Sequence, residues 1–180
     1  MVFLLNKALI VYYDESSFTK PKNNQQKKVS NEEKVVLELK KLLEEKKFLV
    51  DTINLVPTKK LHLKDQFKKE KEITLSNKMP ELNNYKLVLI GTPIVGAMTS
   101  SPVINSFIRK ITFNSKKTKP LFVMYSTGIL HGFELKKLTS LLSMKGIKPI
   151  DSASFCSMFE FDSKKLVEVK NFFNRFFEKI

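Results

Sequence analysis

The sequence predicts a three-layer α/β fold: a doubly wound, five-stranded parallel sheet with strand order 2-1-3-4-5. Short apolar runs alternate with segments in which apolar residues recur at helical spacing, and this alternation is typical of parallel sheets covered by helices. The third apolar run stops at Gly91 and leads through a turn at Thr92 and Pro93 into a loop of small residues and a helix that begins at Pro102. Such a run marks the carboxyl end of a buried parallel strand. Open sheets of this kind bind their ligands along that edge.

The first half of the chain supplies two strands, a helix and a long loop. The continuous apolar run at residues 8–13 predicts a strand that is buried on both faces. The polar, lysine-rich segment 14–29 predicts an extended loop. Ser30 is the predicted N-cap of a helix, because Glu33 follows it at the spacing of a capping box. Residues 48–55 alternate between apolar and polar side chains, which predicts the second strand.

The middle of the chain contains an insertion, two strands and a helix. Residues 57–84 are expected to form an insertion whose scattered apolar residues pack against the sheet. The third strand is predicted at 86–90 and is followed by a helix at 102–111, which carries a proline in its first turn, where the missing N–H group has no helical partner to lose. The fourth strand is predicted at 120–125.

The last part of the chain repeats the strand–helix unit. A helix at 133–145 is predicted to end at Gly146, because glycine favours the left-handed conformation that follows many helices. The fifth strand is predicted at 147–155. A final helix at 162–179 has a broad phenylalanine-rich face, which we expect to lie in the core rather than at a dimer interface. Residues 1–180 are therefore expected to form a single domain.

The composition narrows the classes of function. The 32 Lys and Arg residues outnumber the 18 Asp and Glu residues, which gives a net charge of +14. Arginine occurs only at Arg109 and Arg175. Proteins that recognise nucleic-acid bases favour arginine, so the charge fits a lysine-coated surface better than a sequence-specific nucleic-acid-binding protein. Attraction to a polyanion stays open. The single cysteine, Cys156, allows no intrachain disulfide and favours a cytoplasmic protein. No segment approaches the roughly 20 apolar residues of a membrane helix.

Several catalytic motifs are missing from the sequence. There is no Walker A sequence and no Gly-x-Ser-x-Gly elbow. Asp14 and Glu15 follow the first strand, as an acidic pair does in response-regulator receiver domains, but the phosphoacceptor position after the third strand is Gly91 or Thr92. Two isolated histidines and one cysteine form no recognisable zinc motif.

The segment IGTPIVGAMTSSPV at residues 90–103 resembles flavodoxin-like proteins and their NAD(P)H-dependent FMN reductase relatives. Those proteins carry an apolar strand, Gly-Thr-Pro, a loop that packs on the isoalloxazine ring of FMN, and Ser-Pro at the start of a helix. The stretch LFVMYSTGILHGFELKKL at 121–138 resembles their second ring-binding loop. Residues 29–55 resemble the family's first helix and second strand. Residues 138–156 resemble the later helix, the glycine that ends it and the fifth strand.

This resemblance implies an FMN site at the carboxyl edge of the sheet. One loop that would contact the ring consists of Thr92, Pro93, Ile94, Val95, Gly96, Ala97 and Met98. The other consists of Ser126, Thr127, Gly128, His131 and Gly132. The groups near the phosphate would be Ser16, Ser17, Thr19, Ser30 and Asn31. His131 is also a candidate for a hydrogen bond to a flavin carbonyl or for proton transfer.

The sequence departs from the resemblance at the phosphate loop. In the family this turn is short and rich in Ser, Thr, Gly and Asn, and its N–H groups hold the phosphate. Here Ser30-Asn31-Glu32 replaces the usual Gly-Asn-Thr, and the preceding turn is long and contains no glycine. Glu32 would repel a phosphate. The phosphate site is therefore either rebuilt or lost; a rebuilt site would draw its charge from Lys20, Lys22, Lys27 and Lys28.

Two functions follow from these observations. The first is an FMN-binding redox protein, active in electron transfer or NAD(P)H-dependent reduction, with NAD(P)H or a redox protein as its partner. The positive charge favours an acidic protein partner. The second is a module of the same fold that has lost FMN and binds an acidic protein or a polyanion, such as a nucleic acid or an anionic membrane surface.

Overall fold

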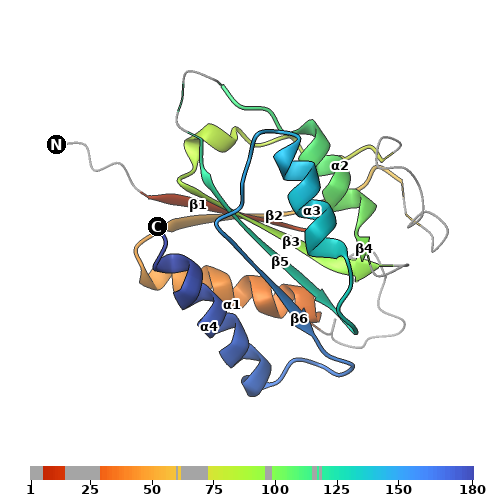
Figure 1. Ribbon diagram of the computed structural model, residues 1–180, viewed down its shortest axis with the longest axis vertical. Helices are drawn as coiled ribbons and strands as arrows, with labels where there is room; N and C mark the ends of the chain where they lie inside the picture. Colours follow the sequence, from red (N-terminus) through yellow and green to blue (C-terminus); the bar gives the residue numbers. More distant parts are fainter. Residues whose placement is uncertain are drawn as a thin grey trace, which may run out of the picture.

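The computed structural model describes residues 6–14, 29–59, 61, 73–95, 99–114, 117 and 119–180. A central parallel sheet is covered by helices on both faces (Figure 1). The parallel strands are β1 (Lys7–Tyr12), β2 (Leu49–Asn54), β3 (Leu87–Val95), β5 (Leu121–Gly128) and β6 (Asp151–Cys156). Their order is β2-β1-β3-β5-β6, which confirms the predicted order, since β5 and β6 are the fourth and fifth predicted strands.

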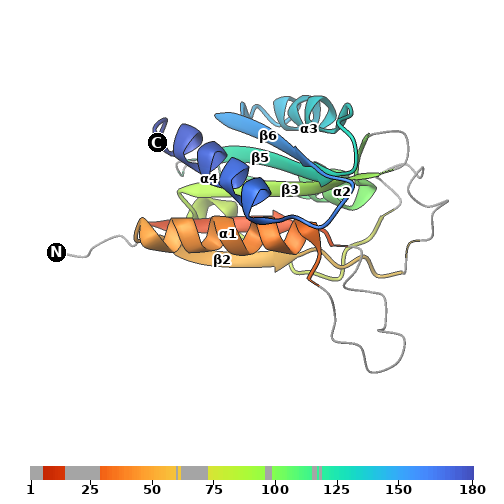
Figure 2. The same cartoon turned by 90° about the horizontal axis from the view of Figure 1, so that it is seen from below.

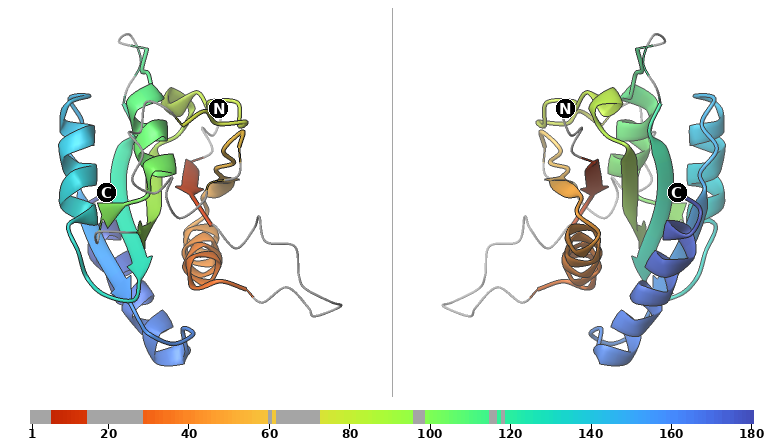
Figure 3. Two further views of the ribbon diagram at one scale, coloured as in Figure 1. Left: turned by 90° about the vertical axis from the view of Figure 1, so that its right-hand side faces the viewer. Right: turned by 90° about the vertical axis from the view of Figure 1, so that its left-hand side faces the viewer.

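The helices form two pairs on opposite sides of the sheet (Figures 2 and 3). The first pair is α1 (Asn31–Glu45) and α4 (Ser163–Phe177), and the second is α2 (Pro102–Lys110) and α3 (Glu134–Ser143). Successive strand residues point to opposite faces, so in β1 Ala8 and Ile10 pack with the α1 and α4 side, and Leu9 and Val11 with the α2 and α3 side. Phe173 of α4 is 1% exposed. The phenylalanine-rich face of the last helix therefore lies in the core, as expected.

The helix ends follow their sequence signals. The Ser30 hydroxyl accepts a hydrogen bond from the backbone N–H of Glu33 at 3.0 Å, which confirms Ser30 as the N-cap of α1. Pro102 occupies the first turn of α2 behind the Ser101 cap. Gly146 has a φ of 68° just after α3, in the left-handed region that glycine tolerates best. Of the helices in the described part of the chain, none is both long and apolar enough to cross a membrane.

The prediction that the third strand stops at Gly91 is wrong. β3 continues through Thr92 and Pro93 to Val95, and then pairs antiparallel with the short strand β4 (Thr99–Ser100). Pairing with β1 ends at Ile90, whereas pairing with β5 extends to Pro93. Beyond Ile90 the strand therefore has no neighbour on the β1 side, where a proline without an N–H group is tolerated.

Two further predicted boundaries differ from the structure. The fourth predicted strand extends past Tyr125, so Ser126, Thr127 and Gly128 are the last residues of β5 and not part of a loop. The fifth predicted strand begins only at Asp151, because residues 147–150 form the approach from α3. In both places the apolar pattern identified the strand and missed where pairing with its neighbour begins or ends.

The predicted insertion at 57–84 is anchored at both of its described ends. Pro57 and Leu75 form an isolated antiparallel bridge, and the 3-10 helix η4 (Leu82–Asn84) buries Leu82. The carbonyl of Ile73 accepts a hydrogen bond from the Ser106 hydroxyl of α2 at 2.8 Å. Residues 62–72 of the insertion and 15–28 of the predicted loop lie outside the described residues.

Candidate functional site

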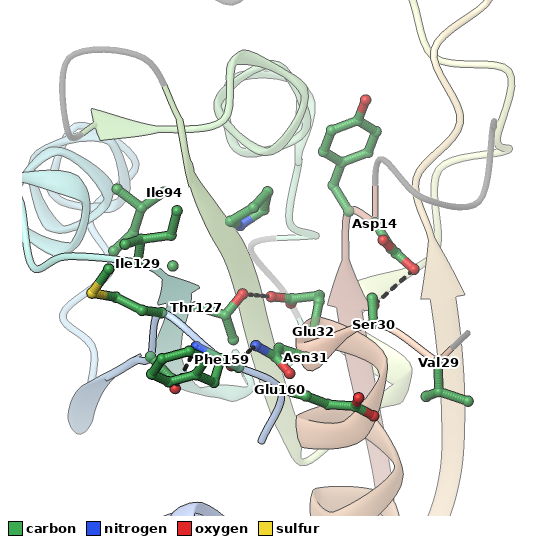
Figure 4. Close-up of a pocket in the computed structure, with 15 residues that line it drawn as sticks. Asp14, Val29, Ser30, Asn31, Glu32, Ile94, Thr127, Ile129, Phe159 and Glu160 are labelled. Atoms are coloured by element: carbon green, nitrogen blue, oxygen red, sulfur yellow. Dashed lines mark hydrogen bonds between the residues drawn. The ribbon is translucent and has the colours of Figure 1, made fainter. Parts of the chain in front are cut away.

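A pocket of about 560 Å³ opens at the carboxyl edge of the sheet (Figure 4). The described residues that line it are Tyr13, Asp14, Val29, Ser30, Asn31, Glu32, Pro93, Ile94, Thr127, Gly128, Ile129, Ser157, Met158, Phe159 and Glu160. They come from the ends of β1, β3, β5 and β6 and from the start of α1. The connections after the neighbouring strands β1 and β3 lead to helices on opposite faces, and open α/β sheets bind ligands at such a switch point.

One end of the pocket is apolar. Pro93 and Ile94 come from β3, and Ile129 follows β5. A Cβ atom at Gly128 would lie 2.8 Å from the Cβ of Ile94, so the Ile94 side chain rests directly on the backbone of β5. Ile129 is 63% exposed and Phe159 is 80% exposed, so both keep apolar surface that a ligand can cover.

The loop between β6 and α4, residues 157–162, is fastened to the first turn of α1. The Asn31 side chain donates a hydrogen bond to the carbonyl of Phe159 at 3.0 Å and accepts one from the backbone N–H of Phe161 at 2.8 Å. Lys34 binds the carbonyl of Phe161 and pairs with Glu160. Phe159 is therefore held beside the pocket by contacts to α1, even though its ring is exposed.

The other end of the pocket is acidic. Glu32 in the first turn of α1 is 4% exposed, and its Oε2 accepts a hydrogen bond from the Thr127 hydroxyl. Its other carboxyl oxygen, Oε1, is buried beside Gly91 and the Tyr125 hydroxyl. Asp14, two residues after the end of β1, accepts a hydrogen bond from the Ser30 hydroxyl at 3.0 Å. Together with Glu160, three carboxyl groups line the pocket, and the described lining residues include no lysine, arginine or histidine.

Burial controls the protonation of Glu32. Loss of hydration raises the pKa of this carboxyl from 4.5 to about 8, and the hydrogen bond from Thr127 offsets only part of the increase. The Tyr125 hydroxyl is also fully buried, and its pKa lies well above the usual value because of burial and the neighbouring Glu32. At neutral pH Glu32 is therefore mainly the neutral acid.

Gly91 explains how Tyr125 and Glu32 fit together. A Cβ atom at this position would lie 2.2 Å from the Tyr125 hydroxyl and 2.5 Å from Glu32 Oε1. Only a residue without a side chain leaves room for both groups. Gly91 therefore supports the floor of the acidic end.

The structure divides the predicted site residues into three groups. Those that line the pocket are Ser30, Asn31, Pro93, Ile94, Thr127 and Gly128. Those that are described but do not line it are Thr92, Val95, Ser126, His131 and Gly132. Those outside the described residues are Ser16, Ser17, Thr19, Gly96, Ala97 and Met98.

Thr92 and Ser126 are neighbours in the sheet, as the idea of two adjacent strand tips requires, but both are fully buried. The Thr92 hydroxyl accepts a hydrogen bond from the backbone N–H of Ser101 at 3.0 Å. The Ser126 hydroxyl lies 2.8 Å from Glu134 Oε1 and 2.8 Å from the Ser154 hydroxyl. The strands run beyond the predicted tips, so the pocket is lined by the residues that follow Thr92 and Ser126.

Sequence reasoning did not assign the β6–α4 loop to the site. Ser157, Met158, Phe159 and Glu160 all line the pocket. Their signal was present in the sequence, because apolar residues follow the fifth strand in a position where a loop is normally polar. Among the described residues, no group of three or more His, Cys, Asp or Glu side chains is placed to hold a metal ion.

Comparison with known proteins rests on the fold. No family model and no curated protein sequence matches the chain. Oxidised flavodoxin 1 from Bacillus cereus superimposes with a TM-score of 0.64 at 11% identity, over 97% of this chain and 99% of that chain. A flavoprotein in complex with FMN from Lactobacillus acidophilus gives a TM-score of 0.58 at 16% identity, over 93% and 98%.

An archaeal flavodoxin gives a TM-score of 0.54 at 12% identity, over 96% of this chain and 97% of that chain. All three similarities extend over nearly the whole of both chains, so they concern the complete fold and not a shared substructure. Together with the strand order, they show that this chain has the flavodoxin-like fold.

Proposed function

We propose that this protein is a flavin-binding redox protein and that the isoalloxazine ring lies in the apolar end of the pocket. The observation that supports this proposal most is the position of the pocket at the switch point of the sheet, with Ile94, Ile129 and Phe159 among its lining residues. A volume of about 560 Å³ is within the range of roughly 300–1,000 Å³ that small-molecule sites occupy.

The residues at this end suit a flat heterocycle. Ile94, Ile129 and Met158 offer aliphatic or thioether contacts, and Phe159 offers an aromatic ring that can pack on a flavin. A bound flavin supplies the redox chemistry, and the chain positions the ring and excludes water from it.

FMN, the flavin that the sequence resemblance implies, fits the described residues only in part. The ring matches the apolar end. A phosphate needs N–H groups or basic side chains, whereas the described side chains at the α1 end of the pocket include two carboxyl groups, Asp14 and Glu32, and no lysine or arginine. The sequence-predicted phosphate contacts Ser30 and Asn31 already bind Asp14 and the β6–α4 loop. We therefore derive no role for this chain through an FMN phosphate.

The partner of the redox reaction is NAD(P)H or another redox protein in this proposal. A net charge of +14 favours an acidic protein partner, because opposite charges speed encounter. A cytoplasmic location, expected from the single cysteine, is part of the same proposal. The same charge supports the second candidate, a flavin-free module that binds an acidic protein or a polyanion.

Flavin binding is tested with purified protein incubated with excess FMN or riboflavin and then separated from free ligand. The proposal predicts that the protein fraction keeps absorbance near 450 nm with at least one of the two flavins. A colourless fraction with both flavins would contradict it. In that case, binding to a polyanion that weakens steeply with salt would support the flavin-free module.

A further inference from the structure

We propose that the edge of the sheet opposite the pocket binds the phosphate backbone of a nucleic acid, through a row of lysines at the starts of the parallel strands. In spatial order these amino-edge lysines are Lys47 before β2, Lys7 in β1, Lys86 before β3, Lys119 before β5 and Lys148 before β6. In Figure 2 the strand arrows point away from the edge at which α4 ends. Strands of six to nine residues are about 20–30 Å long, so the row is remote from the pocket. The proposal therefore goes beyond flavin binding and does not depend on it.

The first argument is that lysine marks one end of every parallel strand and not the other. Each of the five strands begins with a lysine or has one within the three residues before it. The four residues that follow each strand include no lysine. A lysine content spread evenly over the surface would not separate the two ends in this way. The lysine-rich composition alone therefore does not account for the row.

The second argument is that helix dipoles account for only some of the lysines at this edge. Those within two residues after a helix are Lys46, Lys47, Lys145 and Lys179, where a positive charge is favoured. The amino-edge lysines of β1, β3, β5 and β6 lie outside those positions, and a strand has no comparable dipole. Lys7 and Lys86 are neighbours in the sheet, since the Lys86 N–H donates to the Lys7 carbonyl at 2.8 Å. Like charges placed side by side repel each other, and a bound polyanion removes this repulsion.

The third argument is that these lysines are available to a partner. Lys47, Lys86, Lys119 and Lys148 are exposed, and Lys7 is half-buried. The ammonium group of Lys86 lies 6.0 Å from the centre of the Phe48 ring, and that of Lys119 lies 5.7 Å from the centre of the Phe113 ring. Contact with a ring orients the side chain and leaves N–H groups for phosphate oxygens. Within the described part of the chain, no ion pair involves any of the five lysines.

Acidic residues at the same edge offset only part of this charge. They are Glu44, Glu45, Glu81, Asp151 and Glu178. Asp151 pairs with Arg175 and Lys179, and Glu44 lies 3.8 Å from Lys40. The acids are fewer than the basic residues of the edge, which include the row and the lysines after the helices. The edge therefore keeps a net positive charge.

The length of the row suits a stretch of phosphate backbone. Neighbouring strands lie about 4.8 Å apart, so five lysines extend over about 19 Å. One strand of B-form DNA carries about six phosphates over this length. The row contains no arginine, and Arg175 nearby is bound through both of its donating nitrogens to Asp151. Because arginine is the residue that most often reads bases, we expect binding to be independent of sequence.

Two other anionic partners fit this edge less well. A membrane-binding surface combines basic with apolar side chains, but the most exposed large apolar side chains, Phe133, Met158 and Phe159, lie at the opposite edge. Protein interfaces are depleted in lysine and enriched in arginine and aromatic residues. A phosphate backbone needs point charges at regular intervals, which lysine supplies.

The experiment is a fluorescence-anisotropy titration of labelled duplex DNA of about 20 base pairs with the intact chain, at several salt concentrations. With about five phosphate contacts, log K should fall with log salt at a slope of about −4 to −5. Two unrelated sequences should bind within about threefold of each other. The triple variant Lys86→Gln, Lys119→Gln, Lys148→Gln should bind about tenfold or more weakly at low salt, with a slope shallower by about 2 to 3. Replacing the same three lysines by arginine should preserve the affinity.

The matched control removes three exposed lysines near the opposite edge: Lys59→Gln, Lys136→Gln, Lys164→Gln. It carries the same net charge as the amino-edge variant and should bind DNA nearly as well as the wild type. Equal losses in the two glutamine variants would overturn the proposal, because binding would then follow overall charge. A wild type that does not bind DNA, or that strongly prefers one sequence, would overturn it too. So would tighter binding to phosphatidylserine vesicles or to polyglutamate, compared at equal concentrations of negative charge.

Discussion

Two buried glutamates, Glu32 and Glu134, use the same structural device on opposite faces of the sheet. Each lies in the first turn of a helix, α1 or α3, where a carboxyl group is favoured by the helix dipole. Each accepts a hydrogen bond from a hydroxyl at the end of β5: Thr127 binds Glu32, and Ser126 binds Glu134. Consecutive strand residues point to opposite faces, so the two adjacent hydroxyls serve different acids.

The two acids differ in what surrounds them. Glu134 is 1% exposed and accepts hydrogen bonds from two hydroxyls, at 2.8 Å from Ser126 and 3.0 Å from Ser154. Glu32 receives one such hydrogen bond and lines the pocket. The same device therefore joins a helix to the sheet on both faces, and only on the α1 face does the acid also line the pocket.

The largest expected effect is on the pH dependence of stability, through Glu32. Its pKa is raised from 4.5 to about 8 in the folded protein, so the folded state holds a proton that the unfolded chain has released. The free energy of unfolding therefore decreases as pH rises between these values, by up to about 1.4 kcal/mol per pH unit. In Glu32→Gln this contribution disappears. Urea unfolding at several pH values measures it, and parallel profiles for the variant and the wild type would contradict the assignment.

Gly91→Ala tests the packing that supports Glu32. The new Cβ atom would lie 2.2 Å from the ring and hydroxyl of Tyr125, in the centre of β3. We expect the free energy of unfolding to fall by about 3 kcal/mol, because both neighbours are fully buried and must shift. Thermal or urea unfolding measures the loss. A decrease below about 1 kcal/mol would show that the Tyr125 and Glu32 side chains rearrange easily.

The two hydroxyls of β5 can be removed one at a time. Ser126→Ala should lower the free energy of unfolding by about 2 kcal/mol, because the buried Glu134 loses one of its two donors. Thr127→Val keeps the side-chain shape and should lower it by about 1 kcal/mol at neutral pH, where Glu32 is mainly neutral. Urea unfolding of both variants at the same pH provides the comparison. A larger loss in Thr127→Val would reverse the contrast between the two acids.

Asp151, the first residue of β6, is expected to have the smallest effect on stability, and its pH dependence is opposite to that of Glu32. Its partial burial is outweighed by hydrogen bonds from Arg175 and Lys179, which lower the pKa of the carboxyl to about 2. Asp151→Asn should destabilise the protein by about 1 kcal/mol at neutral pH, since the partners are largely exposed. The wild type loses this contribution as pH falls from about 4 through about 2, so the difference between the proteins should vanish in acid unfolding experiments. A difference that persists at low pH would contradict the pairing.

Most of the fold could be predicted from the sequence because each element carries a local signal. The apolar run of β1, the Ser30 cap and the positive-φ Gly146 all lie where local patterns placed them. The ends of β3 and β5 could not be predicted in this way. Whether Pro93 or Thr127 lies in a strand depends on the length of the neighbouring strand, and that length is not encoded in the local pattern.

The site was predictable only in part, for a related reason. The sequence placed Pro93, Ile94, Thr127 and Gly128 at the carboxyl edge through the family resemblance, and the structure brings them together. Phe159 joins them through hydrogen bonds between Asn31 and the β6–α4 loop, which are separated by more than a hundred residues along the chain. Such a contact depends on how the helices pack across the sheet, and no local pattern reports it.

The central claim is that a flavin ring binds between the ends of β3 and β5. Crystal structures of the protein grown with FMN and with riboflavin test it most directly. The account predicts the ring against Ile94, Ile129 and Phe159. A flavin bound elsewhere on the protein, or a pocket without flavin at saturating concentrations of both, would contradict it.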